Sequence, residues 1–339
     1  MRQTIPTAVA LMLIPIVPVC AHAAAQDAPP EPATSGQAGV PVVNSRAEFL
    51  ALSRKDRHRY SRAHREKVSF FVDGQSAWST GADIDNTTGD VSVARLRAGA
   101  GLAFRMSDTA DLIFRGRAQF SFYDFSGAAG VVPSMPTLAD PFDDVYDVSF
   151  EPVFRNLPEH GWQWFVGGRI RSAGESGADF GDTIIGGGFA GASYDITGSL
   201  RLGVGVNVES KLDGGVWAFP VPLIEWDITE DLTLLTREDG VALEYWFANV
   251  WNVSLVAGYE RYQYRFADSS AVSGGSVVDQ RVPVSLALTY SPSESLVISG
   301  RVGAEFGGSL EFYNASDTKI ADTDLDTNLL FGFDVSIAF

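Results

Sequence analysis

The last fifteen residues of the chain alternate between apolar side chains and side chains that are mostly polar or small. The odd positions are Leu325, Thr327, Leu329, Phe331, Phe333, Val335, Ile337 and Phe339, and the even positions are Asp326, Asn328, Leu330, Gly332, Asp334, Ser336 and Ala338. A period of two residues is that of a β-strand with different surroundings on its two faces. The pattern predicts a strand with one apolar face that ends on an aromatic ring.

The same alternation begins at Val68 and recurs along the chain in pairs of strands. The turns between paired strands resemble one another, as in 194–200 (YDITGSL), 226–232 (WDITEDL) and 290–296 (YSPSESL), with looser copies at 104–112 and 247–253. In each turn an aromatic residue closes one strand, polar turn formers follow, and an aliphatic residue opens the next strand. Longer polar loops are expected at 79–90, 126–143, 173–182, 210–216, 267–278 and 308–324.

These features predict an all-β protein, a transmembrane antiparallel up-and-down β-barrel of 14 strands, with 12 strands as the alternative. The count is open between 216 and 247, where Pro220 and Pro222 interrupt one strand and the segment 232–237 is short. Aromatic side chains at the short turns are expected to form a belt at the lipid headgroups: Phe104, Tyr194, Trp226, Phe247, Tyr290 and Phe339. A soluble β-sandwich also alternates, but it would not place rings at the ends of its apolar face.

The region before the barrel divides by composition. We predict a cleaved signal peptide at 1–25, a flexible Pro- and Ala-rich linker at 26–45, a basic periplasmic segment at 46–67 and the outer-membrane barrel at 68–339. The only cysteine, Cys20, lies inside the signal, so the mature chain has no thiol for disulfides or metal binding. A lipid-modified Cys20 is the alternative, which Val19 disfavours because a small residue is wanted there.

With these features the chain resembles Gram-negative outer-membrane β-barrel proteins. The resemblance covers the signal, the repeated hairpins and the terminal Phe339; the C-terminal assembly motif is matched by Ile337 and Phe339, but Asp334 replaces its glycine. The Asp-Ile-Thr turns also resemble those of an uncharacterised outer-membrane barrel family, which brings no known activity. The resemblance implies a location in the bacterial outer membrane (cell outer membrane), contact with outer-membrane lipid and lipopolysaccharide, and recognition of the C-terminal strand by the outer-membrane assembly machinery.

The polar face of the strands should line the lumen, because a charge on the lipid face costs about 2–4 kcal/mol near the bilayer midplane. The predicted lumen-lining residues are Arg95, Arg97, Arg115, Arg117, Arg169, Arg171, Arg201, Arg281, Arg301, Glu151, Glu209, Glu225, Glu244, Glu260, Glu305 and Asp334. In one interpretation an arginine wall faces an acidic wall and filters solutes. In the other, the charges pair across neighbouring strands and plug the barrel.

The function predicted is passive, porin-like passage of small polar solutes. The alternatives are a non-conducting structural or binding barrel and, less favoured, an outer-membrane hydrolase. A hydrolase of the Ser-His type needs a histidine base on the barrel wall. His22, His58, His64 and His160 all lie outside the predicted strands, so we predict no enzyme activity, no catalytic residues and no cofactor.

Charge adds two further expectations. The net charge of −17 excludes nucleic acid as a partner, and Asp322, Asp324 and Asp326 only partly imitate a calcium loop, so they are a weak metal candidate. The basic segment 46–67 has three interpretations: contact with anionic headgroups or cell-wall carboxylates, a plug inside the lumen, or a mobile tail.

Overall fold

The computed structural model describes residues 66–85, 87–142, 144–238, 240–293 and 295–339. The predicted signal peptide, the linker and the basic segment up to residue 65 lie outside them. The elements are β1 Val68–Asp83, β2 Asp90–Arg105, β3 Ala110–Ser126, β4 Val145–Asn156, β5 Trp162–Glu175, the 3₁₀ helix η1 Phe180–Thr183, β6 Ile184–Thr197, β7 Leu200–Ser210, β8 Val216–Asp227, β9 Leu232–Arg237, β10 Gly240–Ala248, β11 Trp251–Ala257, β12 Glu260–Arg265, β13 Ser276–Ser293, β14 Leu296–Tyr313, β15 Lys319–Leu325 and β16 Asn328–Ala338.

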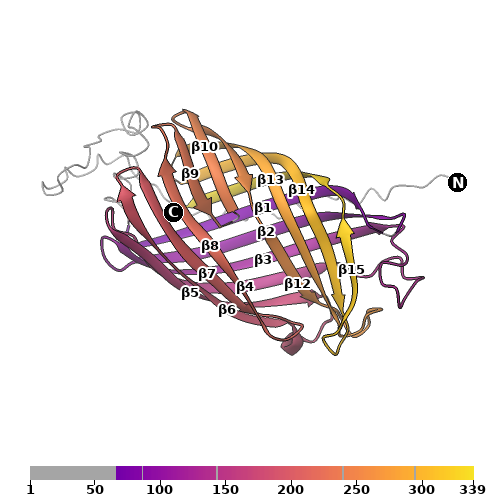
Figure 1. The fold of residues 1–339 in the computed structure, drawn as a ribbon. Helices are drawn as coiled ribbons and strands as arrows, with labels where there is room; N and C mark the ends of the chain where they lie inside the picture. Colours follow the sequence, from indigo (N-terminus) through magenta and orange to yellow (C-terminus); the bar gives the residue numbers. More distant parts are fainter. Residues whose placement is uncertain (1–65, 86, 143, 239, 294) are drawn as a thin grey trace, which may run out of the picture.

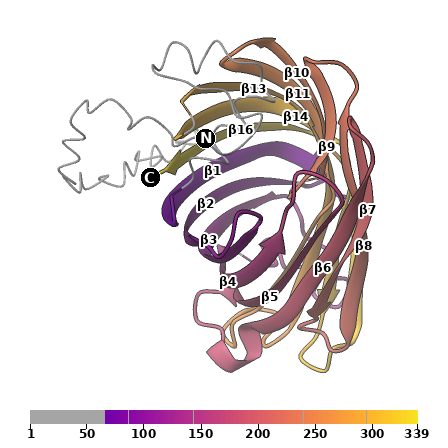
Figure 2. The same cartoon turned by 90° about the vertical axis from the view of Figure 1, so that its left-hand side faces the viewer.

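The sixteen strand segments form a closed barrel of fourteen strands, because two of the fourteen are each divided into two segments. Both β11 and β12 pair with β13, on either side of a break at Gly258 and Tyr259. In the same way both β15 and β16 pair with β14. Each strand is antiparallel to its neighbours in the wall, and the strands curve around one interior (Figures 1 and 2). The predicted count of 14 is confirmed, and the alternative of 12 is wrong.

The last strand closes the barrel. It lies between β1 and β14, with Phe71 opposite Ala338 and Leu296 opposite Ile337. Phe339 and Phe70 exchange backbone hydrogen bonds of 2.7 and 3.2 Å, and their rings stack 5.8 Å apart. The aromatic end of the chain therefore completes the hydrogen-bond network that a bilayer requires of a spanning sheet.

The outward face of the barrel is apolar, as a lipid-facing surface must be. Large hydrophobic side chains are exposed on strands all round the barrel, among them Leu96, Phe120, Val166, Val204, Leu255, Leu286, Val302 and Phe333. A soluble protein rarely exposes so continuous an apolar surface. Within the residues described, no helix is long and apolar enough to cross a membrane. The chain thus has the architecture of an outer-membrane β-barrel.

The connections at one end of the barrel, which we call the turn end, are all short; the opposite end is the loop end. The turn end holds 106–109, 157–161, 198–199, 228–231 and 249–250. Rings pair on the outward face there, as Trp162 does with Tyr194 (5.2 Å between centroids) and Trp251 with Tyr290 (4.6 Å). The predicted belt residues Phe104, Tyr194, Trp226, Phe247, Tyr290 and Phe339 all lie at this end.

The strands extend farther toward the loop end than the sequence predicts. Residues 79–83, 173–175, 276–278, 308–313 and 319–324 are predicted to lie in loops but belong to strands. The reason is an inversion of the pattern, visible in β3: Phe120 and Phe122 point outward, whereas beyond them Tyr123 and Phe125 are buried inside and Asp124 is exposed. The polar residues of such segments face water above the lipid band, so they look like loop residues.

Candidate functional site

The interior changes character along the barrel because its ring narrows at the loop end. Beyond the break at Gly258 and Tyr259, β12 leaves the wall and crosses the interior until Arg265 bridges to Gly174 of β5 in a parallel pair. The ring there contains nine strands, β1 to β5 and β12 to β15, and a bridge from Ile84 to Leu325 completes it. A ring of about eight strands is filled by side chains, whereas a wider one leaves a lumen.

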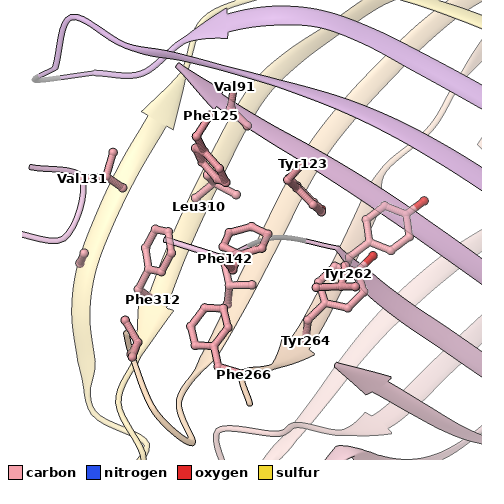
Figure 3. Close-up of a cluster of buried hydrophobic side chains, with 14 of the residues drawn as sticks. Val91, Tyr123, Phe125, Val131, Phe142, Tyr262, Tyr264, Phe266, Leu310 and Phe312 are labelled. Carbon is pink, nitrogen blue, oxygen red and sulfur yellow. The ribbon is translucent and has the colours of Figure 1, made fainter. Parts of the chain in front are cut away.

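Apolar side chains fill the nine-strand ring, and we call them the cap core (Figure 3). Its rings include Tyr123, Phe125, Phe142, Tyr264, Phe266 and Phe312, all of them buried. Phe142, just before β4, stands at the centre: its ring lies 4.6 Å from that of Tyr123, 5.2 Å from that of Phe125 and 5.7 Å from that of Phe266. The cap core therefore fills the narrowed ring at the loop end with buried apolar side chains.

Four charged side chains lie directly beneath the cap core, and we call them the charge cluster: Arg95, Asp279, Arg281 and Glu305. They are 6%, 0%, 1% and 3% exposed. Asp279 accepts hydrogen bonds from Arg95 (2.7 Å), Arg281 (2.8 Å) and the Tyr123 hydroxyl (2.7 Å), while Arg281 also pairs with Glu305. Two positive and two negative charges balance, as burial requires.

In the wider part of the barrel, most charged side chains pair between nearby strands. Arg169 binds Glu151 (2.5 Å) and Glu209 (2.7 Å). Other such pairs are Arg171 with Asp147 (2.8 Å), Arg201 with Glu225 (2.6 Å) and Arg237 with Glu244. Of the two interpretations of the lumen, this arrangement matches pairing rather than two opposed walls.

Ion pairs to Glu238 cross the lumen in this wider part of the barrel. Arg115 and Arg117 of β3 both bind the carboxylate of Glu238, in the turn between β9 and β10. Two guanidinium groups thus share one carboxylate, and they hold the turn to the opposite wall of the barrel.

Arg97 and Arg301 face the interior and make no ion pair with a carboxylate among the described residues. Arg97 binds the amide oxygen of Gln119 (2.7 and 3.0 Å), and within the described chain Arg301 makes no ion pair or hydrogen bond. Both line a cavity of about 20 Å³, room for about one water molecule, together with Glu260, which accepts a hydrogen bond from Tyr262 (3.1 Å). The last predicted lumen residue, Asp334, lies on the inward face of β16, opposite Gln75.

Sequence reasoning missed the residues that close the lumen. Asp279 directly follows the expected loop 267–278, and Glu238 directly follows the short segment 232–237. In the sequence, Tyr123, Phe142 and Tyr264 cannot be told apart from aromatic residues that face lipid. The inverted alternation at the end of β3 is a signal that could have found Tyr123.

The weak metal candidate has no site geometry. Asp322 and Asp324 lie on strand β15, not in a loop, and Asp322 pairs with Lys319 at 2.6 Å. Among the described residues, no group of three His, Cys, Asp or Glu side chains is arranged to hold a metal ion. His160, the one histidine in the described part, lies exposed in the turn 157–161.

No family model and no curated protein matches the chain. Several solved barrels are similar in shape. An outer-membrane channel of Pseudomonas putida F1 is 9% identical over 80% of this chain and 95% of its own, with a TM-score of 0.44. The Pseudomonas putida toluene transporter TodX is 9% identical over 88% and 94%, with a TM-score of 0.40, and the NanC porin is 13% identical over 78% and 98%, with a TM-score of 0.33. At these values nothing about solute or mechanism carries over to this chain.

Proposed function

We propose that the protein lets small polar solutes pass the outer membrane of a Gram-negative bacterium, and that the cap core is its outer gate. The observation that carries the proposal is a charged interior in a 14-strand ring, which is too wide for side chains to fill. A barrel with a purely structural role has no need of arginines such as Arg97 and Arg301, which face the interior and make no ion pair among the described residues.

These two arginines favour anionic solutes. The lining of the cavity that they share holds Arg95, Arg97 and Arg301 against Glu260 and Glu305, an excess of one positive charge. A fixed positive potential in a narrow lumen raises the local concentration of small anions. Axial passage of a solute requires the cap core to move.

The second candidate is a non-conducting structural or binding barrel, and the cap core is the observation that favours it. Closely packed buried side chains leave no path for a solute, so a ring that they fill does not conduct. On either function the outward face meets outer-membrane lipid and lipopolysaccharide, and the assembly machinery binds the C-terminal strand.

Liposome swelling with the purified protein distinguishes the two candidates. We compare the wild type with a variant in which Phe142 and Tyr264 are replaced by alanine, which removes two central rings of the cap core. Phe122→Ala is the control, because it also removes an aromatic ring, but one that points outward from β3 next to the cap-core residue Tyr123.

If the cap core is a gate, the wild type swells slowly, the double variant swells rapidly with small sugars and not with large ones, and the control behaves as the wild type. No swelling of the double variant with any solute overturns the proposal in favour of the non-conducting barrel. Gel electrophoresis of unheated samples identifies any variant that has not folded, because it migrates more slowly than the folded wild-type barrel.

A further inference from the structure

The barrel wall is interrupted beside β8. The ladder between β8 and β9 contains three residue pairs, the last of them Glu225 with Leu235. The nine residues Val216–Ile224 of β8 continue for about 30 Å without a strand partner on that side in the described part of the chain. The hairpin of β9 and β10 is short, with six and nine residues in its strands, and it ends on the turn-end side of this stretch (Figure 1).

The sequence of β8 is adapted to this free edge. Pro220 and Pro222 lack the N–H groups that would otherwise have no acceptor there. At the last point of contact, the Thr236 hydroxyl accepts a hydrogen bond from the Ile224 N–H (3.0 Å) and donates one to the Pro222 carbonyl (2.7 Å). The free edge of β8 therefore lacks N–H groups at its two prolines, and Thr236 bonds the backbone groups beside them. This explains why two prolines are tolerated in a barrel strand.

Only side chains close the wall across this interruption, which we call the seam. The ring of Phe219 stacks on Tyr259 at 5.6 Å and on Trp217 at 5.6 Å, and Arg261 lies 5.7 Å above Trp217. No backbone hydrogen bond joins β8 to β11 or β12 among the described residues. The lower border of the seam is the β9–β10 turn, whose Glu238 is held by Arg115 and Arg117.

An apolar track runs from the seam into the interior. The inward positions of β8 are Trp217, Phe219, Val221 and Leu223, where other strands carry charges. The track continues onto Phe165 and Phe189 of β5 and β6, whose rings lie 6.2 Å apart. Opposite this track stand the arginines of β2 and β3. A molecule with an apolar body and one negative group matches both surfaces.

We propose that the seam is a lateral opening of the barrel that binds small amphipathic carboxylates, whose negative group displaces Glu238 from Arg115 and Arg117. Glu238 is the chain's own carboxylate in that position, and its ion pairs show that Arg115 and Arg117 bind a carboxylate there. Its displacement frees the β9–β10 turn and with it the lower border of the seam. This route through the wall does not depend on axial passage of polar solutes, so either proposal can fail alone.

Tryptophan quenching tests the proposal, because Trp217 lies in the seam. The probe is 8-bromooctanoate, titrated into the protein in lipid nanodiscs, and 8-bromooctanol is the matched uncharged probe. Trp217→Phe removes the reporter, and Trp226→Phe is the matched control on the outward face of the same strand. Mobility on gel electrophoresis confirms that each variant is folded.

We expect saturable quenching by the carboxylate in the wild type and in Trp226→Phe, and its loss in Trp217→Phe. The alcohol should bind about tenfold more weakly, because it lacks charge-assisted hydrogen bonds to the two arginines. Glu238→Gln should bind the carboxylate more tightly than the wild type, since the internal competitor is gone.

Three results overturn the proposal: equal quenching in Trp217→Phe and the wild type, equal affinity for the alcohol and the carboxylate, or an affinity of Glu238→Gln no higher than that of the wild type. Calorimetric titration of 8-bromooctanoate into the wild type and Glu238→Gln gives the same decision if Trp217→Phe does not fold.

Discussion

Replacing Asp279 by asparagine should strongly destabilise the barrel. The two side chains have nearly the same shape, so the change removes charge without creating a cavity. Asp279 is fully buried and receives hydrogen bonds from Arg95, Arg281 and Tyr123. Without its charge, Glu305 alone faces two buried guanidinium groups.

The size of the effect follows from that excess charge. Removing one partner of a buried ion pair costs about 3–5 kcal/mol, because the charge left behind has no water to solvate it. A second change, Arg281→Met, restores neutrality by leaving Arg95 with Glu305, which lie 3.5 Å apart. The double variant should therefore recover part of the lost stability, although Arg281→Met alone destabilises.

Urea unfolding in lipid vesicles, followed by tryptophan fluorescence, measures these free energies. Asp322→Asn is the control: its pair with Lys319 is exposed on β15, and such pairs contribute about 0–1 kcal/mol. A destabilisation of Asp279→Asn no larger than that of the control refutes the reasoning, and so does a double variant less stable than either single one.

Two other substitutions test the wall. Thr236→Val leaves the Ile224 N–H and the Pro222 carbonyl without their partner, so urea unfolding should show a loss of about 1–3 kcal/mol; an unchanged midpoint would mean that water replaces the hydroxyl. Gly203→Ala places a Cβ 2.1 Å from the Ala192 carbonyl oxygen, and thermal unfolding should show a loss of about 1–3 kcal/mol, whereas wild-type stability would contradict the close approach of β6 and β7.

The membrane-spanning part of the fold could be predicted from the sequence because lipid on one side and a polar interior on the other impose a single alternation. The short turns, the start of β1 at Val68 and the closing strand ending at Phe339 follow from that pattern. Even β9 was visible, as the short segment 232–237, although Pro220 and Pro222 left the count open until the free edge of β8 explained them.

The cap core could not be predicted because it reverses the rule that apolar side chains point outward and polar ones inward. Beyond the lipid band, outward side chains meet water and inward side chains pack against each other. At the end of β3 the polar Asp124 therefore points outward and the apolar Phe125 points inward. The inward turn of β12 depends on contacts far apart in sequence, such as Arg265 with Gly174, and no local pattern reports them.

The most direct test of the account is the distance between the ends of β5 and β12. Spin labels at Ser176 and Asp268, in a chain with Cys20 removed, flank a contact in which the Glu175 carboxylate accepts a hydrogen bond from the Ala267 N–H (2.8 Å). If β12 crosses the interior, electron paramagnetic resonance should give a distance below about 20 Å. In a round ring of 14 strands spaced about 4.8 Å apart, the same labels would lie roughly 25 Å or more from each other, and that result would contradict the nine-strand cap.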